Sequence, residues 1–176
     1  RDPDIRNSET LLVASGAEIS VDGAAGNGGE AVLWADGRTD FAGHVNARGD
    51  NTGQGGRVEV SGKKTLSFAG TVDTGGGTLL LDPTDISIVD TITGNATEGA
   101  LSGDYGYAEQ ESVDASEIEA GTLASLLETN NVTITTVNPS GNGSGNITVE
   151  AAVTSGGGSG STTLTLNAEN DIEVNA

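Results

Sequence analysis

The segment 34–40 places side chains suited to ligand binding at every second position. These side chains are Trp34, Asp36, Arg38 and Asp40. An indole ring can stack on a sugar ring, and neighbouring carboxylate and guanidinium groups can hydrogen-bond to its hydroxyls. If Leu33 points inward on an alternating strand, Trp34 points outward, which makes this segment a candidate glycan-binding face. The alternative is structural: Trp34 covers the fold by packing against a loop or against a helix near Leu126, as most aromatic residues do.

The acidic pair Asp82 and Asp85, separated by Pro83 and Thr84, is the second candidate. Two carboxylates three positions apart could hold calcium, or act as acid and base within a cleft. A turn explains them more simply, because Asp before Pro accepts backbone N–H groups while Pro fixes φ. The Gly-Gly-x-Gly-x-Asp calcium repeat is missing. We therefore predict a turn and no metal site, with Asp82 and Asp85 as weak calcium candidates.

Other patterns argue against catalysis. His44 is the only histidine and cysteine is absent, so a typical zinc site cannot form. A serine triad would need His44, but no Gly-x-Ser-x-Gly elbow accompanies it. The glycine-rich tracts lack the Lys-Ser/Thr ending of a phosphate loop. We predict no catalytic residue and no cofactor, and we expect His44 to be a solvated outward residue. A β-helical glycosidase or lyase is disfavoured by the few, scattered basic residues.

Composition limits the partners and the core. The 26 acidic and 7 basic residues leave a formal net charge of −19, which excludes nucleic acid and anionic lipid as expected partners. No apolar run approaches the length of a membrane span, so membrane insertion is not expected. Two Phe, two Tyr and one Trp cannot fill a wide interior, whereas 28 Gly suit a narrow core with many turns. Disorder is the alternative, but β-branched alternations such as Val58-Glu-Val60 argue against it.

The candidate site residues lie within an internal sequence repeat, which determines where the fold places them. Gly28-Gly29-Glu-Ala31-Val-Leu33 matches Gly55-Gly56-Arg-Val58-Glu-Val60 at an offset of 27. The same offset places Phe41 on Phe68 and Val45 on Val72. A period of this size, carrying short strands separated by Gly and Asn, is typical of one coil of a β-solenoid. The glycine pairs are expected to supply corners with positive φ. A β-sandwich is the alternative, but sandwiches do not repeat at one fixed distance.

The repeat divides the chain into four parts. Residues 1–15 lead into the first coil, 16–90 form β-helical coils, 91–131 form an insertion, and 132–176 form further coils. Within the insertion, 94–111 is a polar excursion. After it, Ala115 to Leu127 spaces apolar residues in helical fashion, and Ser116 with Glu119 forms a capping-box pattern. The absence of a signal peptide suggests an internal piece of a longer protein.

Several blocks in order carry a family resemblance. They are Val32-Leu-Trp34-Ala-Asp-Gly37-Arg-Thr-Asp-Phe41, Gly43-His-Val-Asn-Ala-Arg48-Gly49, Gly55-Gly-Arg-Val-Glu-Val-Ser-Gly-Lys63, Gly77-Thr-Leu-Leu-Leu-Asp82-Pro83-Thr-Asp85-Ile86 and Leu123-Ala-Ser-Leu-Leu-Glu-Thr-Asn-Asn-Val132-Thr-Ile. Together with Leu164-Thr-Leu-Asn-Ala168 they resemble the filamentous haemagglutinin family of large adhesins, which are exoproteins of the two-partner secretion route. The resemblance covers roughly residues 16–176.

The resemblance implies a right-handed parallel β-helix shaft. Together with the repeat and its interruption, it gives the predicted fold: all-β, a right-handed parallel β-helix (solenoid) with one short helix-containing insertion. It also implies export through an outer-membrane two-partner secretion transporter and a place on or beyond the bacterial surface. We therefore expect a rigid shaft segment that projects a distal binding region. The partner of that region would be a host-cell or environmental glycan or protein. The alternative function is a glycan-binding module on the Trp34 face.

Overall fold

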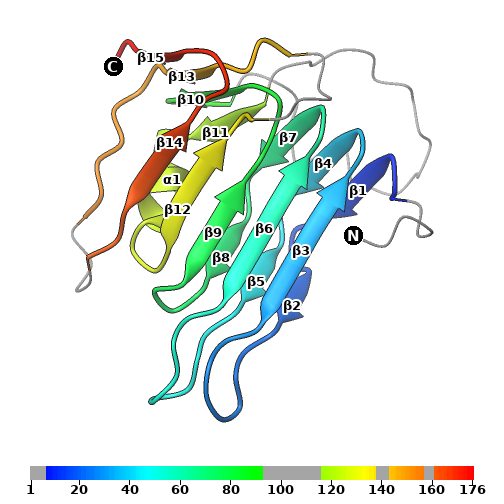
Figure 1. Ribbon diagram of the computed structural model, residues 1–176, viewed down its shortest axis with the longest axis vertical. Coiled ribbons are helices and arrows are strands. Elements are labelled where there is room, and N and C mark those ends of the chain that lie inside the picture. Colours follow the sequence, from blue (N-terminus) through cyan, green and yellow to red (C-terminus); the bar gives the residue numbers. More distant parts are fainter. Residues whose placement is uncertain (1–6, 93–115, 138–142, 157–160) are drawn as a thin grey trace.

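The computed structural model describes residues 7–92, 116–137, 143–156 and 161–176, and in these it contains three parallel β-sheets and one short helix (Figure 1). The prediction of an all-β fold built from parallel strands is confirmed. No helix among the described residues is long and apolar enough to cross a membrane.

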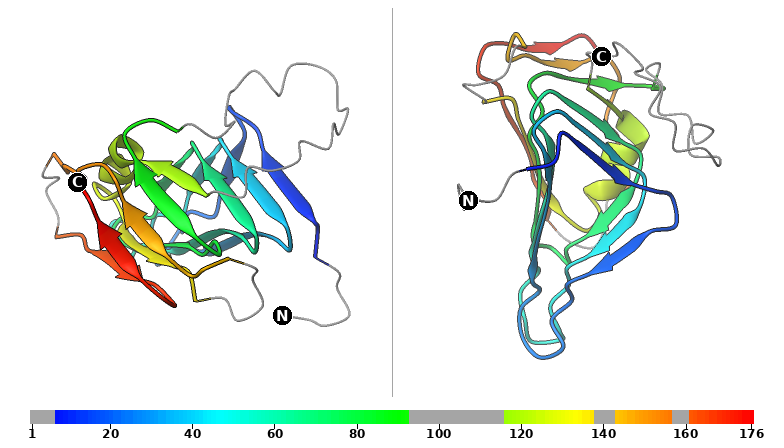
Figure 2. Two further views of the ribbon diagram at one scale, coloured as in Figure 1. Left: turned by 90° about the horizontal axis from the view of Figure 1, so that it is seen from above. Right: turned by 90° about the vertical axis from the view of Figure 1, so that its right-hand side faces the viewer.

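Each sheet is built from strands of successive passages of the chain through the sheets, and each such passage is here called a round. The seven-stranded sheet has the order β1 (Thr10–Val13), β4 (Arg38–Phe41), β7 (Thr65–Phe68), β11 (Glu117–Glu119), β10 (Ile86–Val89), β13 (Ile147–Val149) and β15 (Ile172–Val174). The five-stranded sheet has the order β14 (Leu164–Asn167), β12 (Asn131–Thr135), β9 (Thr78–Leu81), β6 (Arg57–Gly62) and β3 (Glu30–Ala35). The three-stranded sheet has the order β2 (Glu18–Ser20), β5 (His44–Asn46) and β8 (Thr71–Asp73). The three sheets surround a common interior (Figure 2, right).

The order of the strands along the chain is regular over the first three rounds. The chain passes through the seven-stranded, three-stranded and five-stranded sheets in turn as β1, β2 and β3, and repeats this order as β4 to β6 and β7 to β9. Parallel strands require such long crossovers, because a hairpin can join only antiparallel neighbours.

The register of the pairs confirms the repeat that the sequence contains. Val45 lies opposite Val72, and Phe41 lies opposite Phe68, each at the predicted offset of 27. Ile19 pairs with Val45 at an offset of 26, and near the C-terminus Ile147 pairs with Ile172 at 25. Identical or similar side chains therefore stand on neighbouring strands.

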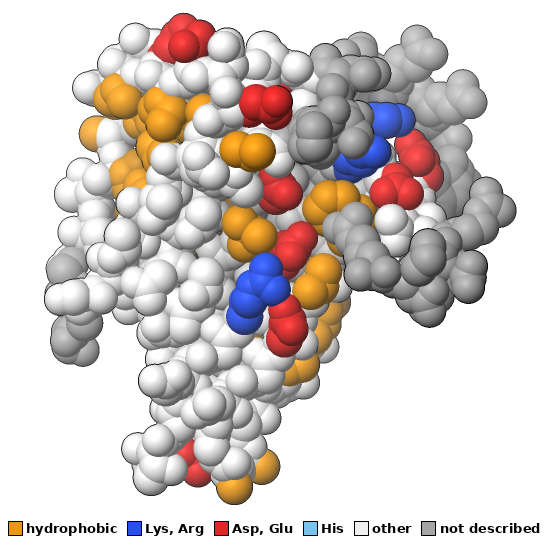
Figure 3. All heavy atoms as spheres, in the orientation of Figure 1, with side chains coloured by type: hydrophobic (Ala, Val, Ile, Leu, Met, Phe, Trp, Pro, Cys, Tyr) orange, Lys and Arg blue, Asp and Glu red, His pale blue; other side chains and the backbone are white. Residues whose placement is uncertain are grey.

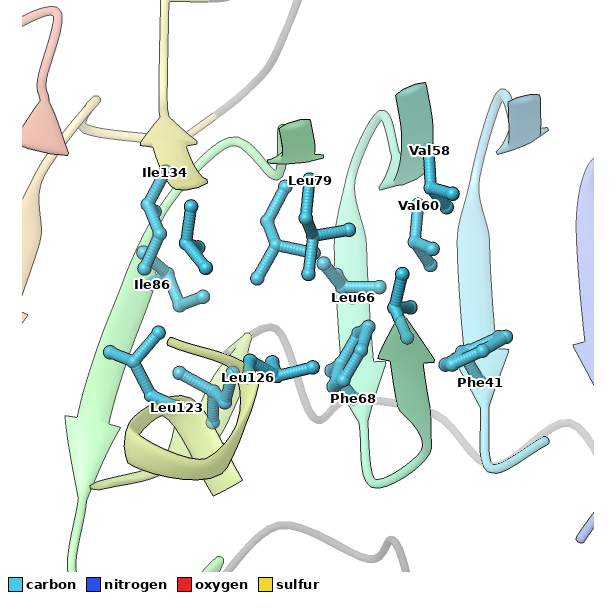
Figure 4. Packing of buried hydrophobic residues seen from close by; sticks show 14 of the residues in the cluster. Phe41, Val58, Val60, Leu66, Phe68, Leu79, Ile86, Leu123, Leu126 and Ile134 are labelled. Carbon is cyan, nitrogen blue, oxygen red and sulfur yellow. The ribbon is translucent and has the colours of Figure 1, made fainter. Parts of the chain in front are cut away.

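Alternation along each strand separates the interior from the surface. In β7, Leu66 and Phe68 are buried while the side chains between and before them are half-buried. The interior side chains come from all three sheets and from the helix, and they converge on one narrow core (Figure 4). This core consists of Val, Leu, Ile and Ala with the pair Phe41 and Phe68, as the shortage of aromatic residues predicts.

The glycine tracts serve a different purpose from the predicted one. In 26–29 only Gly26 has positive φ, and none of the glycines at 53–56 does. These tracts instead lie where stacked loops approach closely. A Cβ atom on Gly28 would lie 2.0 Å from the Ala47 carbonyl oxygen, and one on Gly56 would lie 2.3 Å from that of Gly29. The expectation of positive-φ corners was therefore wrong for most of these positions, because close approach between rounds, and not φ, requires glycine there.

The helix is shorter than the sequence predicted. Helix α1 spans Ala120–Leu126, begins after Glu119, and has no side-chain hydrogen bond at its N-cap. The predicted capping box of Ser116 and Glu119 is therefore wrong. The buried Ser116 hydroxyl instead accepts a hydrogen bond from the Leu66 backbone N–H at 3.0 Å.

The residues before the helix form a strand that lies out of chain order. β11 follows β10 in the chain but lies between β7 and β10 in the sheet. Ile118 pairs with Phe68 on one side and with Ile88 on the other, and it is fully buried. The predicted excursion at 94–111 lies outside the described residues, and the predicted limits of the coils and of the insertion 91–131 stay predictions.

Candidate functional site

The first pair of the predicted glycan site lies where β3 ends. Trp34 follows Leu33, which packs against the core, and so points to the opposite, outer side of the strand. Its ring is half-buried, and its Nε1 donates a hydrogen bond of 3.3 Å to Asp36 Oδ1. The same oxygen accepts one of 3.0 Å from the Asn7 side chain. The polar edge of Trp34 is therefore engaged within the protein.

The second pair lies on the next sheet. Arg38 and Asp40 belong to β4, whose alternate residues Thr39 and Phe41 are buried. Arg38 Nε lies 2.8 Å from both carboxylate oxygens of Asp40. The four predicted residues therefore form two separate pairs on successive sheets, and the charged groups of the second pair bind each other.

The acidic pair at the β9–β10 connection acts across rounds. Asp85 accepts hydrogen bonds from the backbone N–H groups of Ser144 and Asn146, at 3.0 and 2.9 Å, and from the Ser144 hydroxyl at 3.0 Å. These bonds attach the segment just before β13 to the connection between β9 and β10. Asp82 is half-buried in the same connection. Within the described residues no group of three or more His, Cys, Asp or Glu side chains could hold a metal ion.

His44 departs from expectation, because it is half-buried and hydrogen-bonded through both ring nitrogens. Nδ1 lies 2.5 Å from the Thr71 hydroxyl, and Nε2 lies 2.9 Å from Asn46 Oδ1. One neutral tautomer satisfies both contacts: Nε2–H donates to Asn46, and Nδ1 accepts from Thr71. The Asn46 amide in turn donates to Glu18 Oε1 at 3.3 Å.

This network links all three strands of the three-stranded sheet on its outer face. Thr71 lies one 27-residue repeat after His44, so the repeat contained the signal for the contact, which sequence reasoning missed. The order hydroxyl, imidazole, amide resembles a nucleophilic triad, which also requires donors for an oxyanion. The Thr71 N–H cannot serve, because it donates to the Gly43 carbonyl. The contacts shown are those of a polar ladder of side chains across the three strands.

Charge is distributed unevenly along the chain. Residues 65–176 contain 16 Asp and Glu but no Lys or Arg. In the earlier rounds, ion pairs join Arg38 to Asp40, Arg48 to Asp22 and Asp73, Arg57 to Glu30 and Glu59, and Lys64 to Glu9. On the face shown in Figure 3, the Lys and Arg side chains occupy small areas and lie next to Asp or Glu side chains. On this face they form no basic patch of the kind that binds a polyanion.

Asp22 and Asp50 accept hydrogen bonds in the loops that connect β2 to β3 and β5 to β6. The backbone N–H of Thr52 is the main cause that lowers the pKa of Asp50 to about 2, and hydrogen bonding at Gly26 and to the Thr52 hydroxyl adds to the effect. The backbone N–H of Arg48 likewise lowers the pKa of Asp22, aided by the Arg48 side chain. Asp22 is exposed and Asp50 is half-buried, so both carboxylates act as turn acceptors and not as buried acids.

Comparison with known proteins does not assign the chain. No protein-family model matches it, and no curated protein matches it either. The resemblance to the filamentous haemagglutinin family therefore stays a prediction, and function has to be argued from the geometry.

Proposed function

We propose that this chain is a stretch of right-handed parallel β-helix that serves as a rigid shaft in a large secreted bacterial surface protein. The support begins with the regular passage of the chain through three sheets, and with the stacking of equivalent residues in register. Seven stacked strands at a spacing of about 4.8 Å span roughly 30 Å. Backbone hydrogen bonds along that whole length resist bending and stretching together.

The observation that carries the proposal is that each strand of the stack buries the hydrophobic residues of its in-register neighbour. In β13, Ile147 is fully buried and Val149 is 9% exposed. Their partners in β15, Ile172 and Val174, point to the same side but are 46% and 67% exposed. Each strand of this ladder is therefore buried by the next strand of the stack, and a shaft is built by repeating that step.

Location and partners follow from the family resemblance. We propose export by an outer-membrane two-partner secretion transporter, and display on the cell surface or release. The acidic surface suits display, because net charge keeps a long β-structure soluble and opposes pairing of its edges. In this role the segment is structural and non-catalytic, and it projects a binding region that lies elsewhere in the parent protein.

A glycan-binding role for the Trp34 face has less support. A sugar would have to compete with Asp36 for the indole N–H, and with Asp40 for the Arg38 guanidinium. A glycan array with the wild-type chain and a Trp34→Ala variant separates the two roles. We expect equal, background binding from both proteins. Specific glycan binding by the wild type that is lost in Trp34→Ala would favour the glycan-binding role over the shaft role.

The shaft itself is tested on cells that produce the parent protein. Antibodies raised against this chain should label intact cells along surface filaments in electron microscopy. Deletion of the partner transporter should abolish the label, while an antibody against a cytoplasmic protein serves as a control for lysis. Label confined to the cell interior of intact producers would contradict the proposal.

A further inference from the structure

We propose that Asn130 and helix α1 take the place of a fourth strand of the three-stranded sheet and thereby end that sheet at β8. The inference concerns the fold itself and holds whether or not the chain is a shaft.

One edge of β8 pairs with β5 in the ordinary way. The Thr71 N–H donates to the Gly43 carbonyl at 3.0 Å, and the Asp73 carbonyl accepts from the Ala47 N–H at 2.8 Å. Alternate residues of a strand direct their N–H and C=O groups to opposite edges. The Val72 carbonyl and the Thr74 N–H therefore point to the other edge, where the next strand of the stack would lie.

The side chain of Asn130 occupies that edge. Its Nδ2 donates to the Val72 carbonyl at 2.9 Å, and its Oδ1 accepts from the Thr74 N–H at 2.9 Å. A residue of a parallel strand opposite Asp73 would make the same two bonds, because it donates to the carbonyl before its partner and accepts from the N–H after it. One side-chain amide thus reproduces the hydrogen bonds of one strand residue.

The same amide also closes the helix that covers this edge. Nδ2 lies 2.6 Å from the Leu126 carbonyl in the last turn of α1, and the same carbonyl accepts the Asn130 backbone N–H at 3.1 Å. Helix α1 contacts β8, and its Leu123 and Leu126 point into the common interior (Figure 4). Because α1 follows β11 and precedes β12, it occupies the place in the chain order that a strand of the three-stranded sheet held in each earlier round.

The consequence is a sheet that stops while its two neighbours continue. An open strand edge is a template for pairing with another strand. Asn130 is fully buried, and the bond from the Gly76 N–H to the Thr129 carbonyl, at 2.7 Å, extends the closure beyond β8. Growth of the stack past β8 can therefore proceed only through the seven-stranded and five-stranded sheets.

Amide hydrogen exchange tests the proposal directly. In the wild type, the Thr74 N–H should be protected to a degree similar to the Ala47 N–H, which lies in the β5–β8 ladder. In Asn130→Ala, protection of Thr74 should fall about 10- to 100-fold, as expected for loss of one buried hydrogen bond and loosening of α1, while Ala47 keeps its protection. Asn131→Ala is the matched control. The Asn131 side chain accepts from the Thr163 N–H and donates to the Gly76 and Gly77 carbonyls, but it bonds to neither Val72 nor Thr74. The variant should expose Thr163 and leave Thr74 protected.

Two results would overturn the inference. One is exchange of the wild-type Thr74 N–H at the rate of an unstructured peptide, a measurement that needs no variant and stands even if Asn130→Ala fails to fold. The other is a folded Asn130→Ala protein with Thr74 protection unchanged.

Discussion

Phe41 and Phe68 face each other on adjacent strands, with ring centroids 5.0 Å apart and ring planes inclined by 35°. Both rings are buried, Phe41 in β4 and Phe68 in β7. They are the only phenylalanines in the sequence, and they stack on each other across two successive strands of the same sheet.

Replacement of either ring should therefore be costly. We expect Phe41→Ala and Phe68→Ala each to lower the free energy of unfolding by about 3–5 kcal/mol, from lost burial and the cavity left behind. A double-mutant cycle by urea denaturation should give a coupling of about 0.5–1.5 kcal/mol for the tilted pair. Strict additivity of the two losses would show that the rings do not interact.

Val45 tests the hydrophobic ladder. It is fully buried between Ile19 and Val72, so Val45→Asp leaves a carboxylate without a partner in the interior, and several kcal/mol of stability should be lost. Val32, 52% exposed on the outer side of β3, is the matched control, and Val32→Asp should change stability by less than about 1 kcal/mol. Thermal melting of both variants decides the matter, and equal melting temperatures would refute the inward assignment of Val45.

Asp85 tests whether its carboxylate serves structure or calcium. Asp85→Ala removes the acceptor for Ser144 and Asn146 and should cost about 1.5–3 kcal/mol, because bonds to a charged acceptor are the stronger kind. The wild-type melting temperature should be the same with added calcium as with excess EDTA. A calcium-dependent rise that disappears in Asp85→Ala would instead establish a metal site.

Asp50 predicts a specific pH dependence. Its pKa in the folded protein is about 2, below the ordinary 3.8, so the folded state binds this proton less readily than the unfolded state. The stabilisation is therefore complete above about pH 4 and is lost as the pH falls toward 2. Asp50→Asn has no carboxylate that titrates in this range. The wild type should therefore melt at a higher temperature than Asp50→Asn above about pH 4, and the difference should shrink as the pH falls toward about 2. A difference that stays constant from pH 6 to about pH 2 would contradict this account.

Salt should stabilise the protein. With a net charge of −19 and no cation after residue 64, repulsion between carboxylates outweighs the ion pairs of the first rounds. Raising NaCl from about 0.01 to 1 M shortens the screening length from about 30 to 3 Å, and the melting temperature should rise. A fall would mean that exposed pairs such as Arg57 with Glu30 dominate the electrostatics.

The sequence and the structure agree best where the chain repeats. The matches of Phe41 with Phe68 and of Val45 with Val72 predicted their pairing, because stacked rounds place equivalent residues on neighbouring strands. The candidate site was predicted less well. The outward direction of Trp34 follows from alternation, but the assignment of its indole to Asp36, and of Arg38 to Asp40, depends on where the chain turns from one sheet to the next.

Taken alone, the sequence determined the narrow aliphatic core, the inward and outward alternation and the register of the first three rounds, since each is a periodic property of the chain. Only the tertiary structure decided that Glu117–Glu119 is a strand between β7 and β10, and that Asn130 closes the edge of β8. A three-residue segment around Ile118 is too short to show a period. Its conformation is set by the free edges of two strands far away in the sequence, which no local pattern can contain.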